Sequence, residues 1–196
     1  DRVMWALGRA AESHVRKALI KAIPEYVFGR WACPCGYSTL EGTGQYAYSH
    51  RKCGRCRKGI TQYREYTLID EQRGVVGNPD IMILKNGLLT VVECKSTNDK
   101  GLQERVKANA PTANHAGQGL YYRRMAERAG FAMAPSIRVL YIKKEWKWNV
   151  TPYFELDVCE ADKGYKTTLD LMDSTAEEIH RIRKDGRMPA RLGKCT

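Results

Sequence analysis

Two carboxylates and one ammonium group lie close together in this sequence and have the chemistry of a metal-dependent hydrolase site. They are Asp80, Glu93 and Lys95, within the stretch GNPDIMILKNGLLTVVECK that runs from Gly77 to Lys95. Carboxylate oxygens bind hard divalent cations such as Mg²⁺, which keep several waters and leave room for phosphate oxygens. A side-chain cation beside them would lie near the attacking water. These residue types predict metal-assisted hydrolysis of a phosphodiester.

The sequence around these residues predicts a β-hairpin that brings them together. One strand ends near Leu84, a tight turn follows at Lys85-Asn86-Gly87, and a second strand runs from Leu88 to Lys95. The turn folds Asp80 back toward the end of the second strand. A hairpin at the edge of a sheet, with its charges in solvent, is the alternative interpretation of this pattern.

The alternation of side chains along the second strand separates its polar end into two faces. Glu93 and Lys95 should share one face, while Cys94 points into the core. Val91 and Val92 keep the strand apolar up to the acid. A buried strand that ends in charged residues is costly unless the charges pair with each other or with a metal. This cost favours a functional role for Glu93.

A helix near the N-terminus offers a third carboxylate. Apolar residues recur at intervals of four from Val3 to Ile23, and Pro24 ends the pattern, which predicts a helix. Glu12 and Arg16 lie one turn apart on a neighbouring face. Glu12 is the candidate ligand, and His14, on a different face, is its rival. An exposed ion pair between Glu12 and Arg16 is the alternative.

A second helix is predicted downstream of the hairpin, from Ala113 to Arg128. Gln118 and Tyr122 lie one turn apart on one face of it. A glutamine can hydrogen-bond a DNA phosphate or hold a water, and a tyrosine supplies an aromatic edge and a hydroxyl. An ordinary amphipathic helix with a polar rim is the alternative.

Taken in order, these motifs resemble those of the PD-(D/E)XK nuclease superfamily. Pro79-Asp80 and Glu93-Cys94-Lys95 match the two halves of its signature. Gly8-Arg-Ala-Ala-Glu12 is similar to the first-helix motif of RecB-like and lambda-exonuclease-like enzymes, and Gln118-x-x-x-Tyr122 is similar to a motif of the RecB-like branch. The resemblance implies an α/β, restriction-endonuclease-like core, a small mixed sheet flanked by helices, with residues 1–196 forming a single nuclease domain.

The resemblance also implies a site and an activity. Mg²⁺ or Mn²⁺ would be held by Asp80, Glu93, the main-chain carbonyl of Cys94 and Glu12. Lys95 would orient or help deprotonate the attacking water. Gln118 and Tyr122 would complete the catalytic set. The implied function is a deoxyribonuclease, and an exonuclease that needs a free DNA end, in recombination, repair or phage DNA metabolism.

Several other functions stay open at this stage. A restriction-type or junction-resolving endonuclease shares the hairpin motif, and enzymes that cleave RNA use similar residues. A non-catalytic zinc-ribbon adaptor that binds nucleic acid is an alternative from another class. The acids and the lysine favour an enzyme, because a scaffold without activity has no need of them.

Two close cysteine pairs predict a structural zinc site. Cys33 and Cys35 are separated by seventeen residues from Cys53 and Cys56, so residues 31–60 are expected to form a small zinc-ribbon-like insertion outside the nuclease core. His50 is an alternative ligand.

Disulfides and an iron–sulfur cluster are the alternatives to zinc. Disulfides are disfavoured by three further single cysteines and by the lack of a signal peptide, which together predict an intracellular, reducing location in cytoplasm or nucleoid. Some RecB-like relatives hold an iron–sulfur cluster with one early and three late cysteines. Here Cys195 alone lies near the end of the sequence, so the pattern departs from theirs.

The charge balance indicates a polyanionic partner, and DNA is the partner expected. The chain has 33 Lys and Arg against 22 Asp and Glu, for a net charge of +11. Basic residues gather in the cysteine segment, interleaved with Tyr46, Tyr48 and Tyr63, and again at the C-terminus. They are Arg51, Lys52, Arg55, Arg57, Lys58 and Arg64, and then Arg181, Arg183, Lys184, Arg187, Arg191 and Lys194. Such clusters suit contacts to the backbone of DNA.

The rest of the chain predicts further strands at residues 136–143 and 151–158 and a last helix from Ala176 to Lys184, capped by Asp173-Ser174-Thr175. Interleaved strands and helices indicate the α/β class. No apolar run reaches the ~20 residues that span a bilayer, so no membrane partner is expected.

Overall fold

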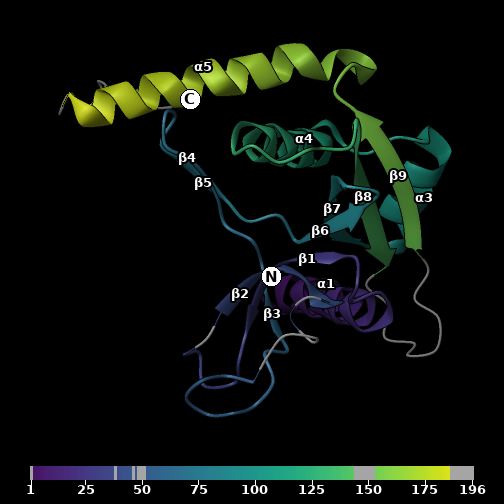
Figure 1. The fold of residues 1–196 in the computed structure, drawn as a ribbon. Coiled ribbons are helices and arrows are strands. Elements are labelled where there is room, and N and C mark those ends of the chain that lie inside the picture. The colour runs from purple at the N-terminus through teal and green to yellow at the C-terminus, as the bar shows by residue number, and fades with distance from the viewer. Residues whose placement is uncertain (1, 38, 46, 48–51, 144–152, 186–196) are drawn as a thin grey trace.

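In the computed structural model the chain forms a mixed seven-stranded sheet with helices on both faces (Figure 1). The structure describes residues 2–37, 39–45, 47, 52–143 and 153–185. The mixed α/β class expected from the sequence is confirmed. The elements in chain order are α1 (Arg2–Ala22), β1 (Val27–Ala32), β2 (Thr39–Thr43), β3 (Gln62–Arg64), β4 (Leu68–Asp70), β5 (Val75–Gly77), β6 (Ile81–Lys85), β7 (Leu88–Thr97), α3 (Asp99–Ala108), α4 (Ala113–Arg128), β8 (Ser136–Lys143), β9 (Tyr153–Cys159), the 3₁₀ turn η1 (Asp162–Gly164) and α5 (Tyr165–Lys184).

The strand order of the main sheet is β2-β1-β6-β7-β8-β9, with β3 also paired to β1. β7 and β8 are parallel, and the other neighbours are antiparallel. Two parallel neighbours need a crossover connection, which α3 and α4 supply. β4 and β5 form a separate two-stranded hairpin.

The alternating side chains of β7 serve two hydrophobic layers. Leu89 and Val91 face α4 and belong to a cluster with Leu120. Val92 and Cys94 face the other way, toward α1, and belong to a second cluster. Figure 1 shows α4 on one side of the sheet and α1 on the other. The strand is therefore buried on both faces, which its continuous apolar sequence allows.

The hairpin that carries the acidic residues forms as predicted. β6 pairs with β7 through a two-residue turn at Asn86 and Gly87, which have φ of 53° and 79°. Positive φ at both central positions is the signature of the turn that matches the twist of a hairpin. α1 and α4 also lie where the periodicity placed them. Of the predicted strand 151–158, the first two residues lie outside the described part, and β9 ends at Cys159.

The expected start of the last helix was wrong. α5 begins at Tyr165, so Asp173 lies inside the helix rather than at its cap. The Asp173 carboxylate is buried and pairs with Arg124 and Arg128 of α4, and Ser174 bonds back to the Leu171 carbonyl at 3.0 Å. Residues that favour caps are tolerated inside a helix when their side chains find such partners.

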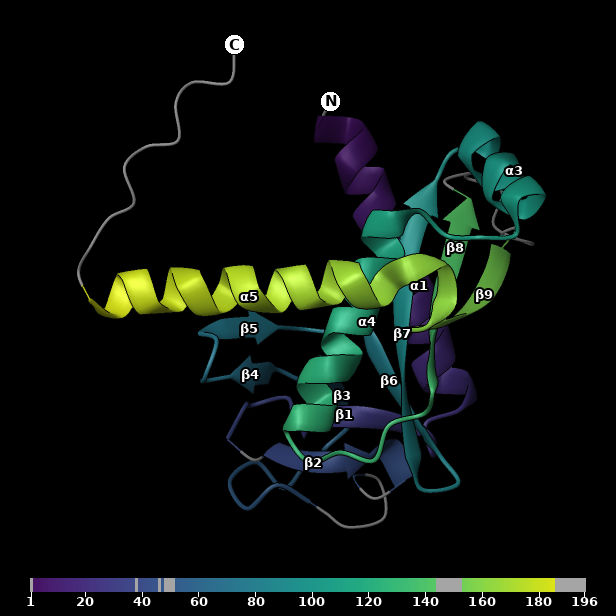
Figure 2. The same cartoon turned by 90° about the horizontal axis from the view of Figure 1, so that it is seen from above.

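α5 forms the outermost layer. Figure 2 shows it crossing α4 and extending toward the β4–β5 hairpin. Arg73, in the turn of that hairpin, contacts Asp173 and Glu177 of α5. The ionic contacts of α5 with α4 and with this hairpin hold the layer in place.

The cysteine segment packs against the main core. β1 belongs to the main sheet and pairs with β6. Trp31, Cys33, Cys53 and Ile60 lie in the same buried cluster as Val92 of β7. No helix in the described ranges is long and apolar enough to cross a membrane.

Candidate active site and cysteine cluster

The candidate site lies where β6 and β7 separate. Their ladder ends at the pair Ile81 and Val92, so the N–H groups of Cys94 and Ser96 on that side have no partner strand. Asp80 Oδ2 accepts from Cys94 N at 2.9 Å. In β7, the N–H and C=O of one residue point to the same side. The main-chain carbonyl of Cys94 therefore faces the same open edge as Asp80.

Glu12 reaches this edge from α1. Its Oε1 accepts from Ser96 N at 3.1 Å and from Ser96 Oγ at 2.9 Å. Glu12 and Asp80 thus lie along the same short stretch of β7, although they come from elements far apart in the sequence. The rival His14 is exposed. Arg16 contacts Glu65 and lies 4.0 Å from Asp80 Oδ1, so it takes part in a contact other than the expected pair with Glu12.

The Glu93 side chain lies on the face of β7 that packs against α4 and is buried, at 1% exposure. Lys95 Nζ lies 2.9 Å from its Oε2, so the two share a face as predicted. Among the described residues, neither carboxylate oxygen of Glu93 has a hydrogen bond of good geometry. Burial, followed by the nearby charge of Asp80, raises the pKa of Glu93 to about 7.

A glycine of α4 lets this helix pack closely over this face. A Cβ on Gly119 would lie 3.1 Å from Glu93 Cγ, tighter than most real contacts, and 2.5 Å from Ile137 Cδ1, so the end of the Ile137 side chain would have to move. The absence of a side chain at residue 119 therefore favours the close packing of α4 against the Glu93 side chain. Burial also raises the pKa of Asp80, although the N–H of Cys94 and the charge of Lys95 oppose this.

Lys95, Gln118 and Tyr122 form a chain of hydrogen bonds. Lys95 Nζ donates to Gln118 Oε1 at 3.0 Å, and Gln118 Nε2 donates to Tyr122 OH at 3.0 Å. Burial works to lower the pKa of Lys95, but the charges of Glu93 and the other acids outweigh it and the net pKa is raised. Lys95 is therefore a fixed ammonium group. The Tyr122 ring fits against Gly77, where a Cβ would lie 2.5 Å from Cε1.

The structure brings all six predicted side chains of the candidate site into one region, through contacts from α1, β7 and α4. Sequence reasoning missed the partners that position them: Glu65, Ser96 and Gly119. Arg16 was noted only as a partner of Glu12. No short stretch of sequence indicates these contacts. Gly119 lies 18 positions from Ile137, and each of the other contacts joins residues at least 22 positions apart.

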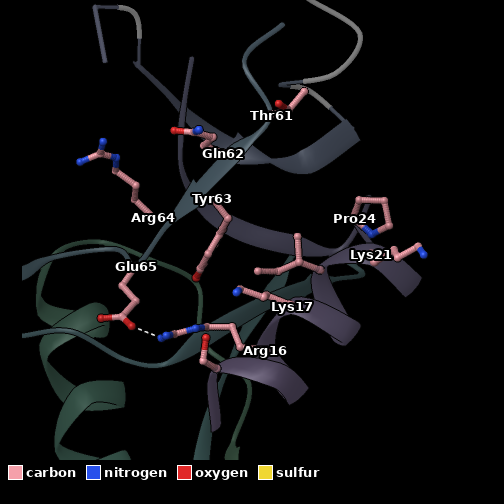
Figure 3. A pocket seen from close by; sticks show the side chains of 11 residues that line it. Arg16, Lys17, Lys21, Pro24, Thr61, Gln62, Tyr63, Arg64 and Glu65 are labelled. Atoms are coloured by element: carbon pink, nitrogen blue, oxygen red, sulfur yellow. Dashed lines mark hydrogen bonds and ion pairs between the residues drawn. The ribbon is translucent and has the colours of Figure 1, made fainter. Parts of the chain in front are cut away.

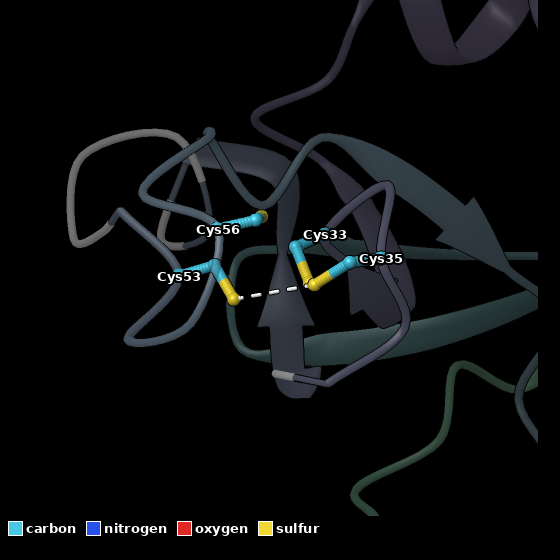
Figure 4. Close-up of side chains that lie close together, drawn as sticks. All are labelled: Cys33, Cys35, Cys53 and Cys56. Atoms are coloured by element: carbon cyan, nitrogen blue, oxygen red, sulfur yellow. Dashed lines mark hydrogen bonds between the residues drawn. The ribbon is translucent and has the colours of Figure 1, made fainter.

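The four predicted cysteines form a compact cluster (Figure 4). The Sγ atoms of Cys33, Cys35, Cys53 and Cys56 all lie within 4.8 Å of one another. Sulfurs about 2.3 Å from a tetrahedral zinc would be separated by a little under 4 Å. The distances of 3.2 Å from Cys33 to Cys35 and 3.6 Å from Cys35 to Cys53 are close to this value. The cluster can hold a metal ion such as zinc.

The second cysteine pair, Cys53 and Cys56, lies in a hydrogen-bonded turn. Cys53 N donates to the Lys58 carbonyl at 2.8 Å, and Arg57 N donates to the Cys53 carbonyl at 2.9 Å. Arg57 has φ of 54°, which closes the turn. The described cysteines form no disulfide. The alternative ligand His50 and the C-terminal Cys195 lie outside the described residues.

The basic residues of the cysteine segment that the structure describes are exposed: Lys52, Arg55, Arg57, Lys58 and Arg64. The guanidinium of Arg55 lies over the ring of Tyr37, 5.9 Å from its centre. Arg181, Arg183 and Lys184 are exposed at the end of α5. Arg51, Tyr46, Tyr48 and the last three basic residues, Arg187, Arg191 and Lys194, lie outside the described part of the chain.

Comparison with models of known protein families finds no match to this sequence, and comparison with curated proteins finds none either. What bears on function is therefore the site: buried Glu93 and Lys95 on one face of β7, Asp80 and Glu12 on its open edge, and a cysteine cluster beside the sheet.

Proposed function

We propose that the protein is a Mg²⁺- or Mn²⁺-dependent deoxyribonuclease with a PD-(D/E)XK core of the RecB-like branch. The observation that carries the proposal is Glu93, a buried carboxylate that lacks a well-aligned hydrogen bond among the described residues and lies next to Lys95. A buried charge of this kind is costly unless a cation joins it. Asp80 and Glu12 supply further oxygens nearby.

The donor set suits a hard divalent cation. Asp80, Glu93, Glu12 and the main-chain carbonyl of Cys94 offer only oxygen, which Mg²⁺ and Mn²⁺ prefer. Glu93 Oε2 already lies 2.9 Å from the Lys95 ammonium group, so Oε1, which has no hydrogen bond among the described residues, is the oxygen that most needs a metal ion. When bound, such an ion supplies Lewis-acid polarisation of a phosphoryl oxygen.

Lys95 would orient the attacking water and supply part of the charge stabilisation. Glu93 and Gln118 hold its ammonium group from two sides, at 2.9 Å and 3.0 Å. A fixed ammonium can orient an attacking water and offset the negative charge that builds on the phosphorus. Tyr122 extends the same chain of hydrogen bonds through its hydroxyl.

A non-catalytic adaptor that binds nucleic acid is the second candidate, and one observation favours it. Asp80 and Glu12 both accept N–H groups from the open edge of β7, so each carboxylate has a structural use without any metal. The exposed basic residues beside the cysteine cluster would then bind the nucleic acid. An adaptor would bind DNA and leave it intact.

Digestion of end-labelled linear DNA and covalently closed circular DNA, with Mg²⁺, Mn²⁺ or a chelator, tests the proposal. We expect metal-dependent loss of linear DNA while closed circles are spared. Tyr122 can stack on a terminal or unpaired base, a contact worth ~1–3 kcal/mol in single-strand binders. A stacked duplex interior offers no such face.

The other outcomes discriminate between the alternatives. Cutting of closed circles as fast as linear DNA would indicate an endonuclease. Cleavage confined to RNA would change the substrate. Tight binding without any cleavage in either metal would favour the adaptor.

A further inference from the structure

A basic pocket lies between α1 and β3, beside the candidate active site (Figure 3). Its volume is about 700 Å³, within the ~300–1,000 Å³ of small-ligand pockets. Four of its lining side chains are cationic, and Glu65 is the anionic one. The cations are Arg16, Lys17, Lys21 and Arg64. This balance suits an anion.

A buried hydroxyl in the pocket lacks a partner. Among the described residues, none hydrogen-bonds the enclosed Tyr63 OH. Burial raises the pKa of Tyr63, so the hydroxyl keeps its proton and can donate. Trp31 holds the ring edge-on, with 5.4 Å between ring centres, and Gly29 leaves room for it. Figure 3 shows the Tyr63 side chain reaching from β3 toward Arg16. The hydroxyl is covered in this structure, so an anion would accept this hydrogen bond once it has displaced Glu65 from Arg16.

Arg16 links the pocket to the candidate active site. Its guanidinium pairs with Glu65 at the pocket and lies 4.0 Å from Asp80 Oδ1. An anion that replaced Glu65 on Arg16 would therefore lie next to the carboxylates proposed to hold the metal.

We propose that this pocket binds one phosphate of a single nucleic-acid strand next to the phosphate that is cleaved, and that Glu65 occupies Arg16 until this phosphate displaces it. Lys17, Lys21 and Arg64 would attract the strand, and Tyr63 would donate to its phosphate. The identity of the anion as nucleic acid depends on the proposed function. The pocket itself stands on its charges and its unsatisfied hydroxyl.

The test is binding of a labelled single-stranded oligodeoxynucleotide by fluorescence anisotropy in chelator, where no cleavage occurs. Lys17→Ala with Lys21→Ala removes two exposed pocket charges. Lys100→Ala with Lys107→Ala on α3 removes two exposed charges elsewhere and is the matched control. The pocket variant should bind about fivefold or more weakly, with a salt dependence of log K lower by about 0.7, since the pocket binds one phosphate and each phosphate contact on a single strand contributes ~0.7. The control should bind nearly as well as the wild type.

The variant Glu65→Gln should change the affinity for the oligodeoxynucleotide in the opposite direction. It removes the competing carboxylate and should tighten binding, and thermal unfolding checks that it is folded. Equal weakening by both double lysine variants would overturn the proposal, because net charge alone would then explain binding. Absence of binding by the wild type would overturn it as well.

The two proposals can fail separately. If the protein cleaves DNA but binds it equally well without Lys17 and Lys21, the pocket proposal is wrong and the nuclease proposal is supported. If binding depends on the pocket lysines but no cleavage occurs in Mg²⁺ or Mn²⁺, the pocket proposal is supported and the nuclease proposal is wrong.

Discussion

Two buried acids in this molecule have pKa values shifted in opposite directions. Asp173 accepts from Arg124 and Arg128, and although burial alone would raise its pKa, these guanidinium groups and Arg73 lower it. Among the described residues, Lys95 is the cation paired with Glu93, and burial raises the pKa of Glu93 to about 7. An acid that stabilises the fold is expected to resemble Asp173. Glu93 is instead costly to the fold, which is typical of a functional site.

Replacing Glu93 by glutamine should therefore stabilise the metal-free protein. The folded pKa lies above the usual 4.5, so the ionised carboxylate destabilises the fold increasingly as pH rises from about 4.5 to about 7. At pH 8 in chelator, Glu93→Gln should raise the free energy of unfolding by about 2–3 kcal/mol. The gain should shrink as pH falls toward 4.5. Denaturant unfolding at both pH values measures it.

Divalent metal supplies the control for this variant. Mg²⁺ or Mn²⁺ should raise the melting temperature of the wild type more than that of Glu93→Gln, because ligand binding to the folded state adds stability. A variant less stable than the wild type at pH 8 without metal would contradict the assignment.

At the scale of elements, the part of the site that follows from local pattern could be predicted. The Asn86-Gly87 turn and the alternation along β7 were sufficient for the hairpin and for the shared face of Glu93 and Lys95. The helix periodicities placed Glu12 and Gln118. Asp80 and Glu12 accept hydrogen bonds from N–H groups of β7 that are free because β6 diverges from β7. This divergence depends on β1 and on long-range packing. No short window of sequence contains that information.

The same limit explains the error in α5. Asp173 looks like a cap because its neighbours Ser174 and Thr175 favour helix starts. Its arginine partners lie 45 or more positions away in α4 and beyond, so their contribution is invisible locally.

The contacts of Asp173 lead to a prediction for stability. Asp173→Asn would leave Arg128 and Arg73 short of a buried partner and should lower the free energy of unfolding by about 3 kcal/mol at pH 7. Because the folded pKa is lowered, this stabilisation is present above the usual pKa of about 3.8 and is lost as pH falls further. Denaturant unfolding of wild type and variant should converge in acid.

Asp170→Asn is the matched control, on the same helix but exposed. It should change stability far less at pH 7. Equal losses of unfolding free energy in the two variants would contradict the prediction, because the buried Asp173 would then stabilise the fold no more than the exposed Asp170.

The cysteine cluster makes a prediction for metal content and for the whole sheet. About one zinc per chain should survive dialysis, held by Cys33, Cys35, Cys53 and Cys56. Cys33 and Cys53 share a buried cluster with Val92, so removal of zinc, or Cys53→Ser, should lower the melting temperature of the entire domain. Elemental analysis after dialysis measures the zinc content, and thermal unfolding during a chelator titration measures the melting temperature. Iron with acid-labile sulfide would overturn the zinc assignment, and a domain melting unchanged without zinc would overturn the coupling.

At the scale of the whole molecule, the charge of +11 already indicated a polyanion as partner. Composition cannot say where the charges gather. Lys17 and Arg64 come together only because α1 packs beside β3, and this packing produces a pocket that neither segment predicts. The fold thus gathers basic side chains from α1 and β3 beside the acidic site.

The most direct test of the central claim is the activity of Lys95→Ala on linear DNA with Mg²⁺ or Mn²⁺. Lys95 pairs with buried Glu93 and donates to Gln118, so the variant should be less stable than the wild type, and thermal unfolding should show that it is folded at the assay temperature. The folded variant should bind DNA in chelator much as the wild type does. Its rate of cleavage should fall by about 10²–10⁴-fold. Cleavage by Lys95→Ala at the wild-type rate would contradict the account.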